Sequence, residues 1–298
     1  MPFITDDEIH SQPDCWQMAG DLLGDVQGLL PRDGEKVAFV GTGTAWFMAQ
    51  AMASLREGAG MGESDAHLAS EMPRSRRYDR VVVLTRSGLT TDINRLLRDL
   101  RGVTPTLAFV GDADVETSPS AGLADEVIDL SFADEASVVQ TRFATTALAL
   151  VRAWVGHDLE RMVEEAREAL QVRLTDEQAD MDQITFLGRA WTVGLAHEAA
   201  WKFRQCTQSW SESYPAMEYR HGPIAVAEPG RVVWMMCPTP YGLAERIRST
   251  GATLVECDRD PMAGLILTQR LAVGRAMKLG LSPDEPRNLS RAVVHSDD

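Results

Sequence analysis

Short apolar runs alternate along the chain with amphipathic stretches of helical period. Four runs rich in β-branched residues and bounded by turn residues predict buried strands, at 36–40, 80–85, 105–110 and 126–130. Helical patterns follow at 45–57, 92–101 and, as one long stretch, 137–172. Strands that alternate with helices in this way indicate a doubly wound parallel sheet with helices on both faces.

The same alternation recurs in the second half of the chain. Expected strands lie at 184–188, 231–236 and 252–257, and expected helices at 193–208, 241–250 and 262–279. We therefore predict an α/β protein of two units with a similar plan. The expected divisions are an N-terminal helical arm at 1–34, a first unit at 35–172, a polar linker at 173–183 and a second unit at 184–298.

The charge balance excludes some classes of partner. The chain has 298 residues, a formal net charge of −15 and a pI of about 4.8. Such a chain repels nucleic acids and anionic membrane surfaces, so we expect neither as a partner. A small phosphorylated ligand stays compatible with this charge, because helix N-termini and hydroxyl groups bind phosphate without a basic surface.

The four cysteines show no paired spacing, which is typical of reduced residues in a cytosolic protein. The acidic start of the chain lacks the pattern of a signal peptide. The most apolar helical stretch, 143–155, is interrupted by Arg152 and is too short to span a bilayer. We expect a cytoplasmic protein, with no metal and no cofactor because no ligand spacing such as HxxxH is present.

Two loops at strand ends are candidate ligand sites. In "FVGTGTAW", Gly41 and Gly43 allow a close backbone approach at a helix N-terminus. The third glycine of a dinucleotide fingerprint is replaced by Trp46, and no Walker lysine follows. By itself this loop is typical of a tight turn with a helix cap.

The second loop, "VVLTRSGLTTD", is rich in hydroxyl groups. They converge before a helix N-terminus, where they suit phosphate oxygens, and Arg86 could add a positive charge. The alternative is a simple helix cap, although one cap does not need four hydroxyl groups. Both loops lie beyond the carboxyl ends of strands, where open α/β sheets bind ligands. The hydroxyl residues are Thr85, Ser87, Thr90 and Thr91.

A third stretch combines a charged helix face with a histidine. Glu198, Lys202 and Gln205 are spaced i, i+4 and i+7 and share one face. His221 precedes a Gly-Pro turn. Taken alone, the spacing of Glu198 and Lys202 is typical of a solvated ion pair. Taken alone, His221 is typical of a structural residue in a turn.

Taken together, "GTGTA", "TRSGLTTD" and "EYRHGP" resemble the tandem sugar isomerase (SIS) domain family, and so do both chain ends, "EIHSQPDCW" and "GLSPDEPRNLSRAVV". The chain is similar to the isomerase half of glucosamine-6-phosphate synthase, to amino-sugar-phosphate deaminases and to fructosamine-6-phosphate deglycases. It lacks a glutaminase segment, so we do not expect a complete amidotransferase. The resemblance implies two SIS units and a homodimer whose sites lie at the subunit interface.

The resemblance also implies a role for each matching residue. Thr85, Ser87 and Thr90 would hold the phosphate of a sugar phosphate, with Gly43 and Thr44 lining the site. His221 would open the sugar ring, since an imidazole exchanges protons near neutral pH. Glu198 and Lys202 match charged positions on the site helix.

Three positions depart from the family pattern. Gln205 stands where relatives carry the glutamate that moves a proton between C1 and C2, and an amide is no base. Arg291 stands where the synthase carries a lysine that can form a Schiff base, which arginine cannot do. Ala45 replaces a frequent phosphate-binding serine.

Three explanations of Gln205 are open. Glu218 or Glu212 could act as the base in its place. The protein could have lost proton transfer and kept ring opening or binding. The glutamine could also be a change introduced to trap substrate.

The leading hypothesis is a phosphosugar isomerase or deaminase that acts on an amino-sugar or fructosamine 6-phosphate. Ring opening precedes aldose–ketose proton transfer, and an amine is released if the substrate carries one. The alternative is a non-catalytic sugar-phosphate-binding SIS protein, a sensor or partner subunit. A DNA-binding regulator fits poorly, because no helix-turn-helix or basic stretch is present.

Overall fold

The computed structural model describes residues 3–174 and 180–295, and its contacts divide the chain into two compact units. The five-stranded unit comprises Asp14–Leu159 and Asn288–Asp298, and the four-stranded unit comprises Met1–Pro13 and Glu160–Arg287. Each unit is therefore completed by a piece from the opposite end of the chain. The linker expected at 173–183 falls partly, at 175–179, outside the described residues.

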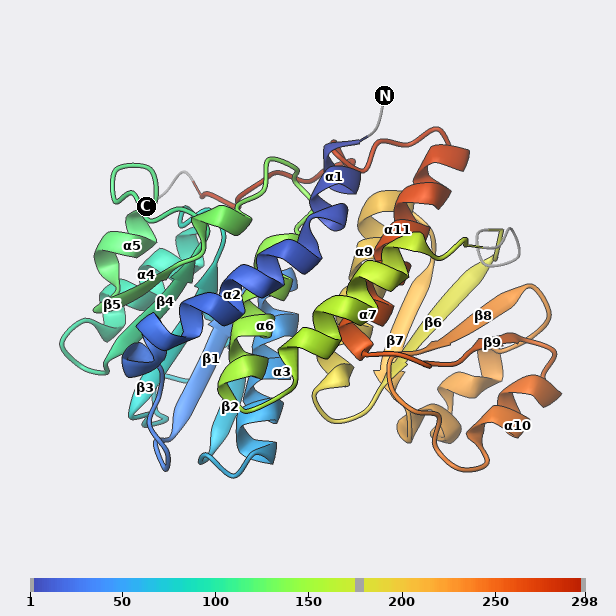
Figure 1. Ribbon diagram of the computed structural model, residues 1–298, viewed down its shortest axis with the longest axis horizontal. Helices are drawn as coiled ribbons and strands as arrows, with labels where there is room; N and C mark the ends of the chain where they lie inside the picture. The colour runs from blue at the N-terminus through green and yellow to red at the C-terminus, as the bar shows by residue number, and fades with distance from the viewer. Residues whose placement is uncertain (1–2, 175–179, 296–298) are drawn as a thin grey trace. The chain divides into compact units, whose positions relative to one another are not determined.

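The five-stranded unit is built on a fully parallel sheet with strand order β2-β1-β3-β4-β5 (Figure 1). Central β3 pairs through Val83 with Val40 of β1 on one side and with Ala108 of β4 on the other. The apolar runs form these inner strands because both faces are covered. The strands are β1 (Val37–Gly41), β2 (Ser64–Leu68), β3 (Arg80–Thr85), β4 (Thr106–Val110) and β5 (Glu126–Asp129).

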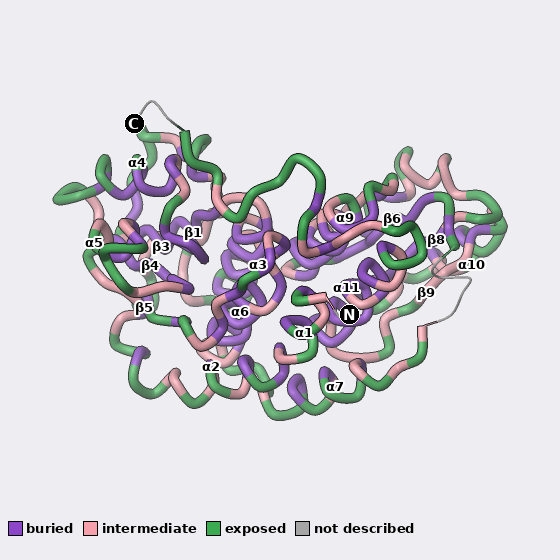
Figure 2. The backbone as a smooth tube through the Cα atoms, turned by 90° about the horizontal axis from the view of Figure 1, so that it is seen from above, coloured by how far each residue is buried: buried purple, intermediate pink, exposed green. Residues whose placement is uncertain are grey.

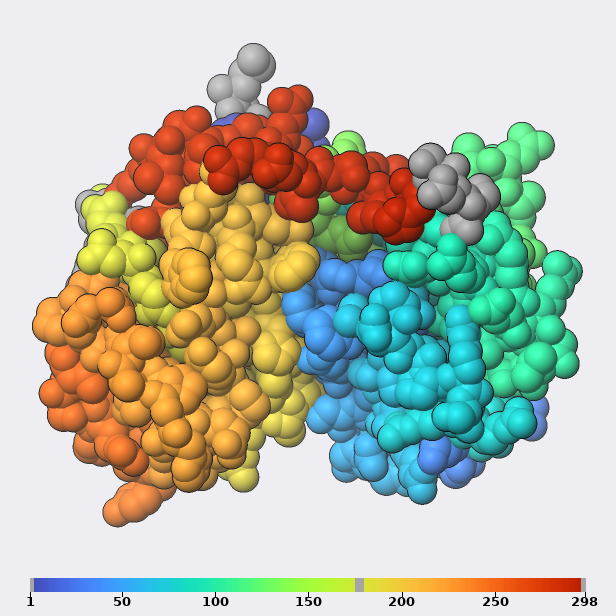
Figure 3. All heavy atoms as spheres, turned by 180° about the vertical axis from the view of Figure 1, so that it is seen from behind, coloured from blue at the N-terminus to red at the C-terminus, as the bar shows by residue number. Residues whose placement is uncertain are grey.

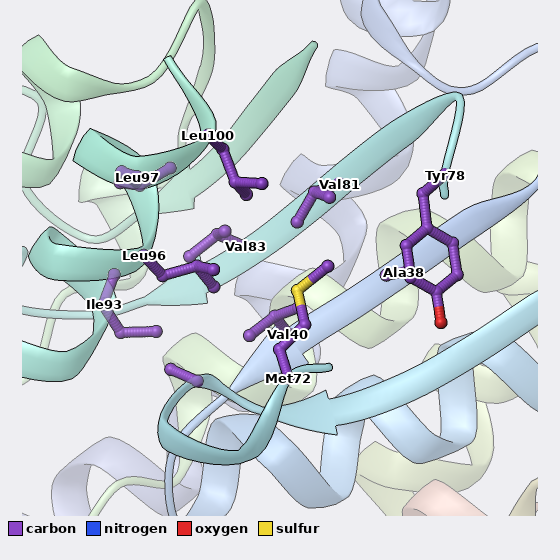
Figure 4. Close-up of a cluster of buried hydrophobic side chains, with 11 residues drawn as sticks. Ala38, Val40, Met72, Tyr78, Val81, Val83, Ile93, Leu96, Leu97 and Leu100 are labelled. Carbon is purple, nitrogen blue, oxygen red and sulfur yellow. The ribbon is translucent and has the colours of Figure 1, made fainter. Parts of the chain in front are cut away.

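Helices cover both faces of this sheet. On one face, leucines and an isoleucine of α4 pack on the valines of β1 and β3 in the cluster drawn in Figure 4. This packing fixes where α4 begins, directly after the loop that follows β3. The helices are α2 (Gln12–Val26), α3 (Thr44–Gly58), α4 (Thr91–Leu100), α5 (Pro119–Leu123) and α6 (Arg142–Trp154), with short 3₁₀ turns η1 (Gln27–Leu29), η2 (Ala69–Glu71) and η3 (Ser131–Ala133).

The four-stranded unit repeats this plan with the parallel order β7-β6-β8-β9. Its strands are β6 (Gln183–Gly188), β7 (Ser211–Pro215), β8 (Arg231–Met235) and β9 (Thr253–Val255). Its helices are α1 (Ile4–His10), α7 (Leu159–Gln171), α9 (Thr192–Thr207), α10 (Leu243–Ser249) and α11 (Pro261–Lys278), with 3₁₀ turns η4 (Glu218–His221) and η5 (Pro223–Val226). The fold class predicted from the sequence, two doubly wound parallel α/β units, is confirmed.

Two kinds of element differ from the sequence prediction. The edge strands β2 and β7 were not predicted, because their polar, half-exposed residues lack the apolar signature of inner strands. The single long helical pattern at 137–172 is wrong: α6 ends at Trp154 and α7 begins at Leu159, with Gly156 between them at a φ of +85°. Figure 2 shows the resulting contrast between buried inner strands and exposed connections.

Strand order locates, in each unit, the edge at which open α/β sheets in general bind ligands. In the five-stranded unit, the chain runs outward in opposite directions from β1 and β3, so the loops after these strands flank a topological switch point. The corresponding loops of the four-stranded unit follow β6 and β8. Within the described part of the chain, no helix combines the length and apolar character needed to cross a membrane.

Candidate functional site

The hydroxyl-rich loop lies between the end of β3 and the start of α4, at the switch point. Thr85 Oγ1 accepts a hydrogen bond from the Gly88 N–H at 3.2 Å, and Ser87 Oγ accepts one from the Leu89 N–H at 3.3 Å. A hydroxyl that accepts from the main chain still has its own O–H to donate. The loop is therefore preorganised to offer hydroxyl donors at the positive end of the α4 dipole.

Thr90 occupies the N-cap position of α4, but its side chain makes no capping hydrogen bond. Its main chain is extended, with φ −61° and ψ 121°, as expected of a residue preceding a helix. The interpretation of Thr90 as a simple helix cap therefore does not explain its side-chain hydroxyl. Thr90 is half-buried, while Thr85 and Ser87 are buried.

Gly88 is required by the loop on two grounds. Its φ of +63° lies in the left-handed region, and a Cβ at this position would lie 1.9 Å from Ser118 Oγ. Its carbonyl oxygen accepts from Asn94 Nδ2 at 3.1 Å and from Ser120 Oγ at 2.9 Å. Asn94 and Ser120 therefore fix the position of the loop through the Gly88 carbonyl. The sequence around these two residues did not predict this role.

The first loop turns tightly from β1 into α3. A Cβ on Gly41 would lie 2.5 Å from the main chain of Ala45, so only glycine lets the helix start this close to the strand. Gly43 is the N-cap of α3 with a φ of 55°, and Thr44 is buried at the first helical position. The predicted lining residues Gly43 and Thr44 thus lie at the same sheet edge as the hydroxyl loop, which follows the neighbouring strand.

Arg86 is buried, with its guanidinium directed into the protein. Nη1 donates to the Ser137 carbonyl at 2.8 Å, and Nη2 donates to the Arg291 carbonyl at 2.9 Å. Nη1 lies 3.8 Å from the Glu135 carboxylate, and both side chains of this ion pair are almost fully buried. These contacts make Arg86 a support of the loop.

The C-terminal segment 288–295 packs against the hydroxyl loop, and Figure 3 shows the last described residues lying on the surface. The Thr91 N–H donates to the Val293 carbonyl at 3.2 Å, and the His295 N–H donates to Thr91 Oγ1 at 3.0 Å. Arg291 donates through Nη2 to both carboxylate oxygens of Asp134 at 2.8 Å. Thr91 and the guanidinium of Arg291 are therefore engaged in holding the tail.

In the four-stranded unit, α9 carries a buried charged pair. Lys202 Nζ lies 2.8 Å from Glu198 Oε1, and each side chain is only 1% exposed. Lys202 also donates to Gln205 Oε1 at 3.2 Å. The interpretation of Glu198 and Lys202 as a solvated ion pair is therefore wrong. The pair is buried, and removing one partner of a buried pair strongly destabilises a protein. The same burial raises the pKa of the neighbouring Cys206 thiol to about 12.

His221 and Glu218 lie on the short 3₁₀ turn η4, and both are exposed. Residues three apart eclipse one another on a 3₁₀ helix, so these side chains project from the same side of the turn. The turn is anchored by buried Tyr219, whose pKa is raised to about 12, mainly by burial. Arg220 Nη2 donates to the Tyr241 carbonyl and ties the turn to the loop after β8.

Glu212, the other carboxylate considered as a base, lies near the amino end of β7. Gln183 Nε2, at the start of β6, donates to Glu212 Oε2 at 3.4 Å. Ligands of open α/β sheets bind at the opposite, carboxyl edge. Among the residues that the structure describes, no cluster of His, Cys, Asp or Glu has the arrangement of a metal site.

Comparison with known proteins identifies relatives of the whole chain. Glutamine–fructose-6-phosphate aminotransferase (isomerizing) from Methanothermobacter thermautotrophicus is 26% identical over 336 residues, which cover 96% of this chain and 56% of that protein. The chain spans about half the length of the curated relatives it matches. No protein-family model matches.

Solved structures share the fold over nearly the full chain. Glucosamine-6-phosphate deaminase from Thermotoga maritima superposes with a TM-score of 0.83 at 23% identity and covers 98% of this chain and 100% of that one. Tagatose-6-phosphate ketose/aldose isomerase from Escherichia coli has a TM-score of 0.79 at 15% identity and covers 100% and 97%. The expected resemblance to tandem SIS proteins is confirmed.

Proposed function

We propose that this chain, which has the fold of the tandem SIS proteins, is an enzyme that binds an aldose or ketose 6-phosphate, opens its ring and moves a proton between C1 and C2. The hydroxyl loop at the switch point is the observation that carries the proposal. Its hydroxyl groups and helix N-terminus suit a phosphate ester in a protein of net charge −15. The names of the similar proteins support the same substrate class.

Each part of the reaction has a candidate residue. Thr85, Ser87 and Thr90 bind the phosphate oxygens, while Gly43 and Thr44 line the site. His221 exchanges a proton with the ring oxygen, which opens the ring. Proton transfer between C1 and C2 then needs a base, and Glu218 is the carboxylate on the same side of η4 as His221.

A non-catalytic sugar-phosphate-binding protein is the second candidate. The hydrogen bond between Lys202 and Gln205 favours it, because an amide held by an ammonium group supplies no base. Amine release from an amino-sugar or fructosamine 6-phosphate belongs to the first candidate only. In that reaction, water replaces the amine at the sugar carbon.

We further propose that the protein is a homodimer in which His221 serves a substrate bound by the other copy. Mixing two variants tests this point. Under the proposal His221→Asn and Thr90→Val are each impaired alone at sugar-phosphate concentrations below the wild-type Kd, and their mixture exceeds the mean of the two activities through mixed dimers with one intact site. A mixture no more active than that mean contradicts shared sites.

A panel of hexose, hexosamine and fructosamine 6-phosphates tests the proposed function. Isomer formation and ammonia or amine release are followed with the wild type and with His221→Asn. The proposal predicts turnover of at least one substrate and a loss of about 10²–10⁴-fold in the variant. Tight binding of a sugar phosphate without any turnover favours the second candidate, and absence of binding contradicts both.

A further inference from the structure

Glu135 is a buried carboxylate near the start of α6, and the proposed function gives it no role. Its Oε1 atom accepts hydrogen bonds from the Thr141 hydroxyl and the Arg142 N–H, each at 2.7 Å, and also from the Thr141 N–H. A carboxylate that accepts from the first amide groups of a helix caps it and complements its dipole. One carboxylate oxygen of Glu135 is therefore engaged by the N-terminus of α6.

The other carboxylate oxygen of Glu135 faces the hydroxyl loop. Oε2 lies 3.8 Å from Arg86 Nη1, and the side chains of Glu135 and Arg86 are 0% and 1% exposed. The main-chain carbonyl of Glu135 accepts a further hydrogen bond from Arg291 Nε at 3.1 Å. Glu135 thus contacts α6, the hydroxyl loop and the C-terminal segment, all within the five-stranded unit.

The position of Arg86 depends on a nearby negative charge. Arg86 stands between two of the proposed phosphate ligands, Thr85 and Ser87. Its guanidinium donates to two main-chain carbonyls, which carry no net charge. A buried cation is costly unless an opposite charge lies close to it, and Glu135 supplies that charge.

We infer that Glu135 is a positioning residue for the phosphate group: through Arg86 it holds the hydroxyl loop in the conformation that binds a phosphate ester. This inference rests on the proposed function, which assigns Thr85 and Ser87 to the phosphate. Without the negative charge of Glu135, the Arg86 guanidinium loses its buried counter-charge, and the loop shifts to bring it closer to water. A displacement of about 1 Å in a binding group is enough to impair function severely.

Calorimetric titration with fructose 6-phosphate tests the inference in the wild type, Glu135→Gln, Arg86→Gln and the double variant. Glutamine keeps an acceptor oxygen for α6 and removes the charge. Arg56→Gln is the matched control. Arg56 is another buried arginine of the same unit, and it donates to the carbonyls of Gly62 and Arg32, which precede β2 and β1 at the opposite edge of the sheet.

We expect the dissociation constant to rise about tenfold or more in Glu135→Gln, as for loss of a hydrogen bond to a charged group. In Arg56→Gln it should stay within about threefold of the wild-type value, because the two sites share no partner. Urea unfolding of each variant measures the stability lost, which a purely structural role would change without changing affinity. The double variant should bind no more weakly than Arg86→Gln, since Glu135 acts through Arg86.

Wild-type affinity in Glu135→Gln, an equal loss in Arg56→Gln, or additive losses in the double variant overturn the inference alone. Should Glu135→Gln fail to fold, the double variant takes its place, because it buries neither of the two charges. Wild-type affinity in the double variant then overturns the inference. If the wild type does not bind fructose 6-phosphate, the inference and the proposed function fail together.

Discussion

Arg86 Nη2 donates a hydrogen bond to the main-chain carbonyl of Arg291 at 2.9 Å, across 205 residues of sequence. The first residue belongs to the hydroxyl loop and the second to the C-terminal segment. The carboxylate of Asp134 holds the side chain of Arg291 in place. Both arginines therefore contribute to the shape of the loop, and the candidate phosphate ligands around them are neutral hydroxyl and N–H groups.

Loss of the Arg291 side chain should release the tail without unfolding the unit. In Arg291→Ala, we expect the free energy of unfolding to fall by about 1 kcal/mol or less, because the ion pair with Asp134 is substantially exposed. The Thr91 amide, whose partner is the Val293 carbonyl, should exchange its hydrogen faster. Hydrogen exchange by NMR measures both effects, with exposed Arg287→Ala as the control. Equal protection of Thr91 in all three proteins contradicts this account of the tail.

Alanine at Gly88 should distort the hydroxyl loop. The left-handed φ costs about 1–2 kcal/mol for a residue with a Cβ, and the overlap with Ser118 Oγ adds to it. Gly102 is a matched control, because its φ of +72° is similar and a Cβ there meets no atom within 4 Å. Urea unfolding should show a larger loss for Gly88→Ala than for Gly102→Ala, and phosphate-ester binding should weaken only in the former. Equal losses in the two variants are incompatible with a tightly built loop.

Burial of Cys206 makes stability fall in alkaline solution. Its pKa rises from 9.0 to about 12 in the folded protein, mainly through desolvation. Between these values, the unfolded chain releases a proton that the folded chain keeps. The free energy of unfolding therefore decreases by up to about 1.4 kcal/mol per pH unit above pH 9 from this thiol. Urea unfolding between pH 7 and pH 10.5 should show a shallower decline in Cys206→Ala than in the wild type, and identical slopes count against the assignment.

The inner framework was predictable, and particular residues show why. Valine-rich runs such as 80–85 are typical of strands covered on both faces, and this run forms β3 as predicted. The loop containing Thr85, Ser87 and Thr90 was predictable because its position after a strand is local information. The polar strands β2 and β7 were not predictable, since their pairing partners are set by the sheet and not by their own pattern.

The contacts of the charged side chains could not be predicted from the sequence. Arg86 was expected to add charge for a phosphate, yet its guanidinium contacts the carbonyls of Ser137 and Arg291. The spacing of Glu198 and Lys202 indicated an ion pair but not its burial, which depends on packing by distant elements such as α11. Asn94 and Ser120, which support Gly88, carry no local signal of that role.

Binding of a phosphate ester by the hydroxyl loop is the central claim, and calorimetric titration of fructose 6-phosphate and fructose tests it most directly. The Thr90→Val variant removes one hydroxyl without changing the side-chain size, and Thr104→Val, beyond the other end of α4, is the control. The account predicts that the wild type and the control bind the phosphate ester but not fructose. Thr90→Val should bind the ester about tenfold or more weakly, as expected for loss of a hydrogen bond to a charged group. Equal affinity of Thr90→Val and wild type, or equal binding of both sugars, would contradict the claim.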